Sequence, residues 1–150
     1  MIEVRLVKAE DSEAWLAMRM ALWPEDLEGE HRDEIDRFFA GEFPRWPWSA
    51  FIAVDESGRA AGFAEVSVRP WAEGCRDTRV AYLEGWFVMA HARKSGVGRA
   101  LVTAAEEWGR SQGCREFASD ADSENDVSKA AHGALGFTDV GLARCFRKDL

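Results

Sequence analysis

The sequence predicts one α/β domain over residues 1–150, in which helices flank a mixed, mostly antiparallel central sheet. Three observations predict this fold class. A chain of this length can bury a core without disulfides or metals. Segments with strand or helix periodicity follow one another in the order β-α-α-β-β-β-α-β-α-β. A glycine-rich turn separates the longest predicted strand from an amphipathic helix, and such a turn can bind phosphate.

The first half of the chain predicts three strands and two helices. The elements are a strand over 2–7, a helix from 11 or 12 to about 22, a helix over 28–40, and strands over 50–54 and 60–68. Asp11 or Ser12 can cap the first helix, and Pro24 ends or redirects it. The second helix is strongly acidic on one side. The Glu56-Ser57-Gly58 turn joins the two later strands into a hairpin.

The second half predicts the remaining strands and two more helices. The elements are a strand over 79–89, a helix over 97–110, a strand over 116–119, a helix over 125–135, and final strand residues at 140 and over 142–146. The strand over 79–89 is largely apolar at its end, so we expect it to be central. Gly113 ends the helix over 97–110.

Composition excludes several classes of protein. The net charge of −8 argues against nucleic acid as a partner. Charges interrupt every apolar run, so neither a membrane span nor a signal peptide is expected. The three cysteines (Cys75, Cys114 and Cys145) lack metal-ligand spacing. We therefore expect a cytoplasmic protein with reduced thiols and no bound metal.

The most informative segment runs from Phe87 to Arg99 and contains Gly96-Val97-Gly98. Helix starts expose unpaired N–H groups, and glycines let that backbone approach a phosphate closely. Nearby arginine and lysine side chains add positive charge to an acidic protein. The segment matches neither the Walker A pattern nor the dinucleotide fingerprint. A solvated basic helix start is the alternative interpretation.

This segment resembles the signature of the GNAT acetyltransferases, which Arg93, Gly96 and Gly98 match. A second signature is matched by Asn125 and by Leu135-Gly136-Phe137. The resemblance implies the GNAT fold, splayed between strands four and five, with acetyl-CoA as cosubstrate. It also implies a homodimer. The residues that it implies for acetyl-CoA are Phe87, Val88, Met89, Arg93, Lys94, Ser95, Gly96, Val97, Gly98, Arg99, Asn125 and Ser128.

Longer stretches are similar to the aminoglycoside 6′-N-acetyltransferases within that family. They are Leu22-Trp23-Pro24, Leu83-Glu84-Gly85, Gly113-Cys114-Arg115-Glu116 with Ala118-Ser119-Asp120, and His132-Gly133-Ala134-Leu135-Gly136-Phe137. A polycationic amine needs carboxylates for its charges and aromatic faces for its rings. We therefore expect an aminoglycoside acceptor, bound by Trp23, Glu25, Trp71, Glu84 and Asp120.

Three residues are candidates for catalysis of direct attack by a neutral amine in a ternary complex. Glu84 can act as the base or can only bind the ammonium. Asp120 can share those roles or can cap the following turn. His132 occupies the position at which many family members have a tyrosine, so it can protonate the leaving thiolate or only line the cofactor tunnel.

Two other functions remain compatible with the sequence. The first is an acetyltransferase for another cation, such as a polyamine, an amino acid or a protein N-terminus. The second is a GNAT-like module that binds coenzyme A without turnover.

Overall fold

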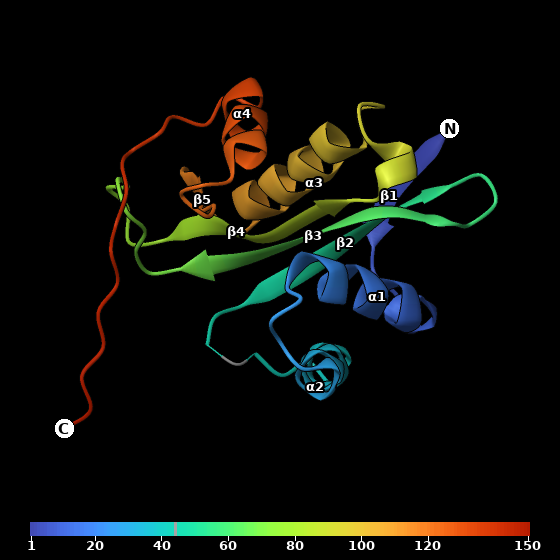
Figure 1. The fold of residues 1–150 in the computed structure, drawn as a ribbon, viewed down its shortest axis with the longest axis horizontal. Helices are drawn as coiled ribbons and strands as arrows, with labels where there is room; N and C mark the ends of the chain where they lie inside the picture. Colours follow the sequence, from blue (N-terminus) through green and yellow to red (C-terminus); the bar gives the residue numbers. More distant parts are fainter. Residues whose placement is uncertain (44) are drawn as a thin grey trace. The chain divides into compact units, whose positions relative to one another are not determined.

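The computed structural model describes residues 1–43 and 45–150, which form two compact units, residues 1–119 and 120–150. The first unit contains all five strands (Figure 1). Its elements are β1 (Ile2–Leu6), α1 (Ser12–Leu22), α2 (Glu28–Phe39), β2 (Trp48–Asp55), β3 (Ala60–Arg69), β4 (Val80–Val88), α3 (Val97–Ser111) and β5 (Phe117–Ser119), with short 3-10 turns at Ala9–Asp11 and Ala90–Ala92. The second unit contains α4 (Asp126–Ala134).

The sheet has the strand order β1-β2-β3-β4-β5 and is mixed, as the sequence predicts. The first four strands pair antiparallel, whereas β4 and β5 pair parallel. That last pairing covers only Ala81–Leu83 of β4, although β4 continues to Val88. The predicted splay between strands four and five is therefore confirmed, and it leaves the second half of β4 without β5 as a neighbour.

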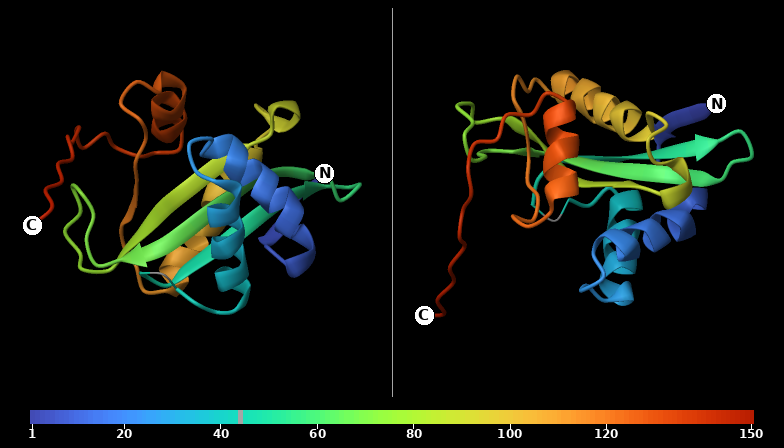
Figure 2. Two further views of the ribbon diagram at one scale, coloured as in Figure 1. Left: turned by 60° about the horizontal axis from the view of Figure 1, so that its bottom comes forward. Right: turned by 45° about the horizontal axis from the view of Figure 1, so that its top comes forward.

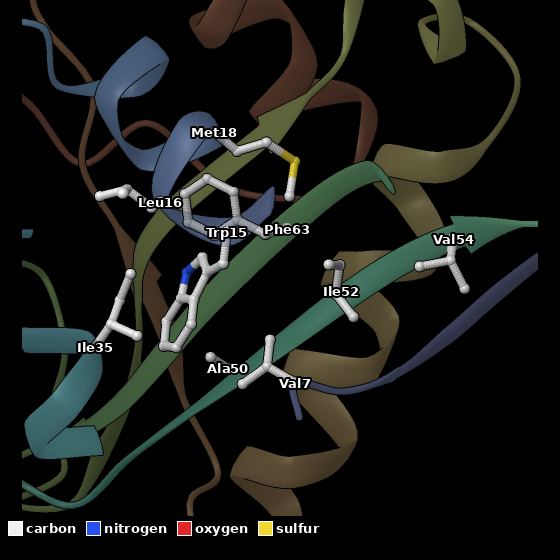
Figure 3. Close-up of a cluster of buried hydrophobic side chains, with 9 residues drawn as sticks. All are labelled: Val7, Trp15, Leu16, Met18, Ile35, Ala50, Ile52, Val54 and Phe63. Carbon is white, nitrogen blue, oxygen red and sulfur yellow. The ribbon is translucent and has the colours of Figure 1, made fainter. Parts of the chain in front are cut away.

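Helices α1 and α2 lie on one face of the sheet and α3 lies on the other (Figures 1 and 2). The core under α1 gathers apolar side chains from both helices and the first strands, with Trp15 fully buried next to Phe63 (Figure 3). Helix α3 contributes Val97, Leu101 and Val102 to the opposite face. The central strands are thus covered on both faces, as a mainly apolar strand requires.

The strands predicted at 140 and over 142–146 are wrong, because residues 138–150 form neither helix nor strand. Val140, Leu142 and Phe146 are 57%, 83% and 89% exposed. An alternating apolar pattern specifies a strand only when a neighbouring strand offers its backbone groups. The other predicted helices and strands exist, with ends that differ by a few residues at most.

Three structural findings bear on the expectations from composition. Within residues 1–43 and 45–150, no helix has the length and apolarity needed to cross a bilayer. All three cysteines carry free thiols. In the same described residues, no three histidine, cysteine or acidic side chains gather where they could hold a metal ion.

Candidate acetyl-transfer site

A β-bulge places Glu84 in the middle of β4. Gly85 pairs with Glu65 of β3 and Leu83 pairs with the next residue, Val66, so Glu84 is the extra residue on β4. Bulges re-aim side chains and are frequent next to active sites. Glu84 and Gly85 both face the α1 side of the sheet, because Glu84 contacts Ser67 and Gly85 contacts Trp23.

Glu84 is held on both carboxylate oxygens by residues of β3. Its Oε1 accepts hydrogen bonds from Ser67 Oγ at 2.5 Å and from Arg69 Nε at 2.7 Å. Its Oε2 accepts from Arg69 Nη2 at 2.6 Å. Ser67 and Arg69 alternate along the strand and therefore share one face. The candidate base is thus a paired carboxylate that lies half-buried.

Aromatic rings fix Arg69 in turn. Its guanidinium carbon lies 3.6 Å from the centre of the Tyr82 ring and 5.0 Å from that of Trp46. Arginine stacks well on aromatic faces, and its planar fork matches a carboxylate. Neither Ser67 nor Arg69 was predicted as a site residue. Their position at alternate residues near the end of a strand was the only signal in the sequence.

Trp23, predicted to bind the acceptor, lies against the strand directly after the bulge. Its ring atoms are 2.6 and 2.9 Å from the place that a Cβ at Gly85 would occupy, so only glycine fits there. The ring also stacks on His31 and lies 5.2 Å from the Arg19 guanidinium. The structure therefore brings Trp23 to the neighbour of Glu84, at the end of α1.

A second carboxylate, Glu65, is buried under α1 on the same face. It accepts a hydrogen bond from Trp15 Nε1 at 2.9 Å, and its Oε1 lies 3.5 Å from Arg19 Nε. Burial raises the pKa of Glu65 to about 7, against the opposing effects of Arg19 and Trp15. Arg19 also pairs with Glu34 of α2. Arg19 thus links the buried Glu65 to the ring of Trp23.

The turn after β4 has the backbone that the glycine pattern predicts. Lys94 and Gly96 both adopt left-handed conformations, with φ of 60° and 87°. In the described part of the chain, the amides of Ser95, Gly96, Val97 and Gly98 donate no backbone hydrogen bond. Four successive free amides at the start of α3, beside Arg93 and Arg99, fit a pyrophosphate.

The end of β4 presents backbone groups on its open edge. The Met89 amide donates to the Ala61 carbonyl of β3 at 2.9 Å. Because successive residues of a strand alternate, the amide of Val88 points away from β3. The Val88 carbonyl accepts from Arg93 Nε at 3.1 Å. Residues 87–89, which the resemblance implies for acetyl-CoA, thus offer backbone groups with which an extended ligand can pair like an added strand.

Gly98 packs tightly against the sheet, which the sequence did not reveal. A Cβ at Gly98 would stand 3.0 Å from the Trp86 ring on β4. Replacement of Gly98 would therefore disturb the packing of α3 on the sheet as well as any phosphate contact.

The second unit contains three of the predicted site residues on or beside α4. The Asn125 side chain caps the helix by accepting from the Ser128 amide at 3.0 Å. His132 Nδ1 lies 2.7 Å from the Ser128 carbonyl. A carbonyl can only accept, so Nδ1 carries the proton that points to Ser128. To donate a proton to a ligand from its other nitrogen, Nε2, His132 must therefore be an imidazolium.

The other predicted acceptor residues are exposed. Glu25 and Trp71 lie on loops of the first unit, and Trp71 is 65% exposed. Asp120 is exposed and begins the second unit, directly after β5. Of the acidic residues of α2, several pair with arginines instead, as Glu28 does with Arg32 and Asp33 with Arg37.

Comparisons with known proteins agree with this geometry. Residues 14–137 match the Acetyltransferase (GNAT) family. The chain is 52% identical to the aminoglycoside N(6′)-acetyltransferase type 1 of Klebsiella aerogenes, over 98% of this chain and 96% of the relative. It is 38% identical to the protein of the same name from Serratia marcescens, over 92% of each chain.

Two solved structures share the fold along the whole chain. One is AAC(6′)-Iy in complex with the bisubstrate analog CoA-S-monomethyl-acetylneamine, with a TM-score of 0.91, 33% identity, and coverage of 100% of this chain and 99% of that one. The other is the aminoglycoside 6′-N-acetyltransferase AAC(6′)-Ih from Acinetobacter baumannii, with a TM-score of 0.91, 32% identity and the same coverage.

Proposed function

Because this chain belongs to the GNAT acetyltransferase family, we propose that it transfers an acetyl group from acetyl-CoA to the 6′-amine of aminoglycosides. The observation that carries the proposal is that two candidate binding features adjoin on and directly after β4. One strand holds the bulged carboxylate Glu84 and leads directly into the turn of free amides after Val88. A carboxylate suited to a cation on β4 is thus followed by a turn suited to an anion.

The chain's residues have distinct tasks in this reaction. Acetyl-CoA supplies an activated acetyl thioester. The amides from Ser95 to Gly98 bind its pyrophosphate, and the Val88 amide is the donor proposed for the thioester carbonyl. Glu84 binds the acceptor amine, while Trp23 offers an aromatic face to its sugar ring. Because Arg69 and Ser67 already occupy Glu84, we favour amine binding over proton abstraction as its role.

Two residues of the second unit complete the proposed machinery. Asp120 is a second carboxylate for the acceptor, and it can accept the proton that the ammonium must lose before attack. His132, as an imidazolium, can protonate the leaving thiolate. The family match runs from residue 14 to residue 137, which supports one acetyltransferase domain that includes both units.

The proposed setting of the enzyme is a cytoplasmic homodimer. Free thiols at Cys75, Cys114 and Cys145 support a reducing compartment. The exposed apolar side chains of Val140, Leu142 and Phe146 support a second copy as their partner. Sedimentation of the purified chain tests the dimer.

A thiol-release assay tests the proposed activity directly. We expect release of coenzyme A with aminoglycosides that carry a 6′-amine, and none with matched aminoglycosides that carry a 6′-hydroxyl. Faster turnover of linear polyamines or N-terminal peptides would instead identify another amine acetyltransferase. Binding of acetyl-CoA without thiol release on any amine would identify a coenzyme A-binding module.

A further inference from the structure

Arg69, the last residue of β3, contacts both oxygens of Glu84 and lies near two aromatic rings. We propose that Arg69 is a positioning residue that sets both the affinity and the protonation state of the acceptor amine at Glu84. The inference rests on the proposed function, because it takes Glu84 as the carboxylate that receives the amine. In this role Arg69 weakens the binding of the ammonium form of the acceptor and favours the neutral amine that attacks.

The first step is the number of free positions on Glu84. An ionised carboxylate can accept about four hydrogen bonds, two on each oxygen. Oε1 already accepts from Ser67 and Arg69, whereas from residues 1–43 and 45–150 Oε2 accepts one hydrogen bond, that of Arg69. One position on Oε2 therefore remains for the acceptor. Arg69 and Ser67 thus fix both where the amine binds and how many of its N–H groups Glu84 can hold.

The second step is that Arg69 stays in place when an acceptor arrives. Its guanidinium stacks on Tyr82 at 3.6 Å and lies 5.0 Å from the centre of the Trp46 ring. The side chains of Arg69 and Glu84 are 27% and 26% exposed. A bidentate, stacked arginine is a far stronger competitor than a mobile lysine. The acceptor therefore shares Glu84 with Arg69 instead of displacing it.

The third step is electrostatic. A free Glu84 would attract an ammonium and stabilise it, which raises the pKa of the amine and delays its deprotonation. The positive charge of the Arg69 guanidinium offsets the negative charge of Glu84, so the bound amine meets a nearly neutral pair. Compared with an unpaired Glu84, this arrangement lowers the pKa of the bound amine and enlarges the fraction that can attack. The ammonium form, which is the ground state, binds more weakly as a result. The enzyme therefore favours the reacting neutral amine relative to the ammonium form.

The chain offers a matched control for this arrangement. Arg45 lies with its guanidinium carbon 5.8 Å from the centre of the same Trp46 ring, whereas the fork on Glu84 belongs to Arg69. Arg69→Gln and Arg45→Gln therefore remove the same charge from the same ring. Only the first variant frees Glu84. Arg69→Lys retains the charge but not the two-oxygen fork.

The experiment measures steady-state kinetics against pH, with an aminoglycoside that carries a 6′-amine. For Arg69→Gln we expect the acceptor KM to fall about threefold and kcat to fall about tenfold. The acid side of the kcat profile, which reports groups in the enzyme–substrate complex, should move to higher pH by about half a unit or more, after allowance for partial exposure. Arg45→Gln should match the wild type. Arg69→Lys should lose kcat but keep the wild-type pH profile.

Each other outcome counts against the proposal. An unmoved pH profile in a folded Arg69→Gln, with kcat lower and KM higher, would show a purely structural residue. Equal behaviour of Arg69→Gln and Arg45→Gln would remove any role at Glu84. Should Arg69→Gln fail to fold, a shifted profile in Arg69→Lys would overturn the charge argument. A wild type without thiol release on aminoglycosides would refute the proposed function instead, so the two failures are distinguishable.

Discussion

Two carboxylate–arginine pairs lie on the α1 side of the same sheet, and they differ in burial. The side chains of Glu65 and Arg19 are each 4% exposed, whereas those of Glu84 and Arg69 are 26% and 27% exposed. Glu65 has Trp15 as an additional donor, and Glu84 has Ser67. Both pairs join a glutamate to an arginine, but Arg69 donates to both oxygens of Glu84 at 2.6 and 2.7 Å, whereas Arg19 Nε lies 3.5 Å from Glu65. Access to solvent decides which of the two carboxylates a ligand can reach.

The difference has an energetic consequence. Removal from water makes a charge costly, and burial therefore raises the pKa of Glu65 to about 7. Glu65 and Arg19 lie in the core, where Arg19 packs against Trp15 and Trp23. Glu84 is 26% exposed, so a ligand can reach it without opening the core.

The largest expected effect follows from breaking the buried pair. Arg19→Met leaves Glu65 buried without its cation, and at pH 8 we expect the free energy of unfolding to fall by about 3–5 kcal/mol. The loss should be smaller at pH 5, where Glu65 is protonated. Urea unfolding measures both values. Arg37→Met removes the exposed pair with Asp33 and should change stability by no more than about 0.5 kcal/mol.

The next effect is the pH dependence that Glu65 confers on stability. Its folded pKa of about 7 exceeds the ordinary value of 4.5, so the folded state holds a proton that the unfolded state loses. The stabilisation is complete below pH 4.5 and is lost as the pH rises to about 7. Relative to Glu65→Gln, the wild type should lose up to about 3 kcal/mol across that interval. Parallel curves for the two proteins would contradict the assignment.

A substitution at Asp120 tests whether Glu84 is the sole carboxylate that acts on the acceptor amine. Asn can still cap a turn but has no charge. If Asp120 holds or deprotonates the amine, Asp120→Asn should lower kcat/KM for an aminoglycoside at least about tenfold, or roughly 1.4 kcal/mol. Affinity for acetyl-CoA, measured by calorimetry, should not change. Near-normal kcat/KM would leave Asp120 with the capping role and Glu84 as the acceptor carboxylate.

The smallest effect concerns a positive charge in the glycine-rich turn before α3. Lys94 adopts a left-handed backbone that costs a side chain about 1 kcal/mol. Lys94→Gly should therefore retain or slightly raise stability, while affinity for acetyl-CoA falls about threefold. Lys94→Asn, which also tolerates this backbone, serves as the control for chain flexibility. An unchanged affinity in both variants would mean that the free amides of the turn suffice for the phosphates.

Local patterns in the sequence predicted the sheet, its helices and the glycine-rich turn before α3. The turn was accessible because glycines, basic residues and the following helix lie within one short segment. The bulge at Glu84 was not, since it depends on the register between β3 and β4. The partners Arg69 and Arg19 were missed for the same reason: each meets its carboxylate across strands or between a helix and the sheet.

The terminal segment illustrates the opposite error. Apolar and polar residues alternate after Val140, and a strand was the natural prediction. Alternation indicates which side chains could share a face but supplies no neighbouring strand. Residues 138–150 therefore remain without regular structure in the single chain.

The most direct test of the account compares Glu84→Gln with Glu65→Gln at pH 6. Both variants replace a carboxylate by its neutral isostere, and burial already keeps Glu65 largely protonated at that pH. We measure kcat/KM for an aminoglycoside with a 6′-amine, with the KM for acetyl-CoA as internal reference. The account predicts a loss of at least about tenfold for Glu84→Gln and less than about twofold for Glu65→Gln. Equal losses, or a larger loss for Glu65→Gln, would contradict the claim that the open pair serves the acceptor.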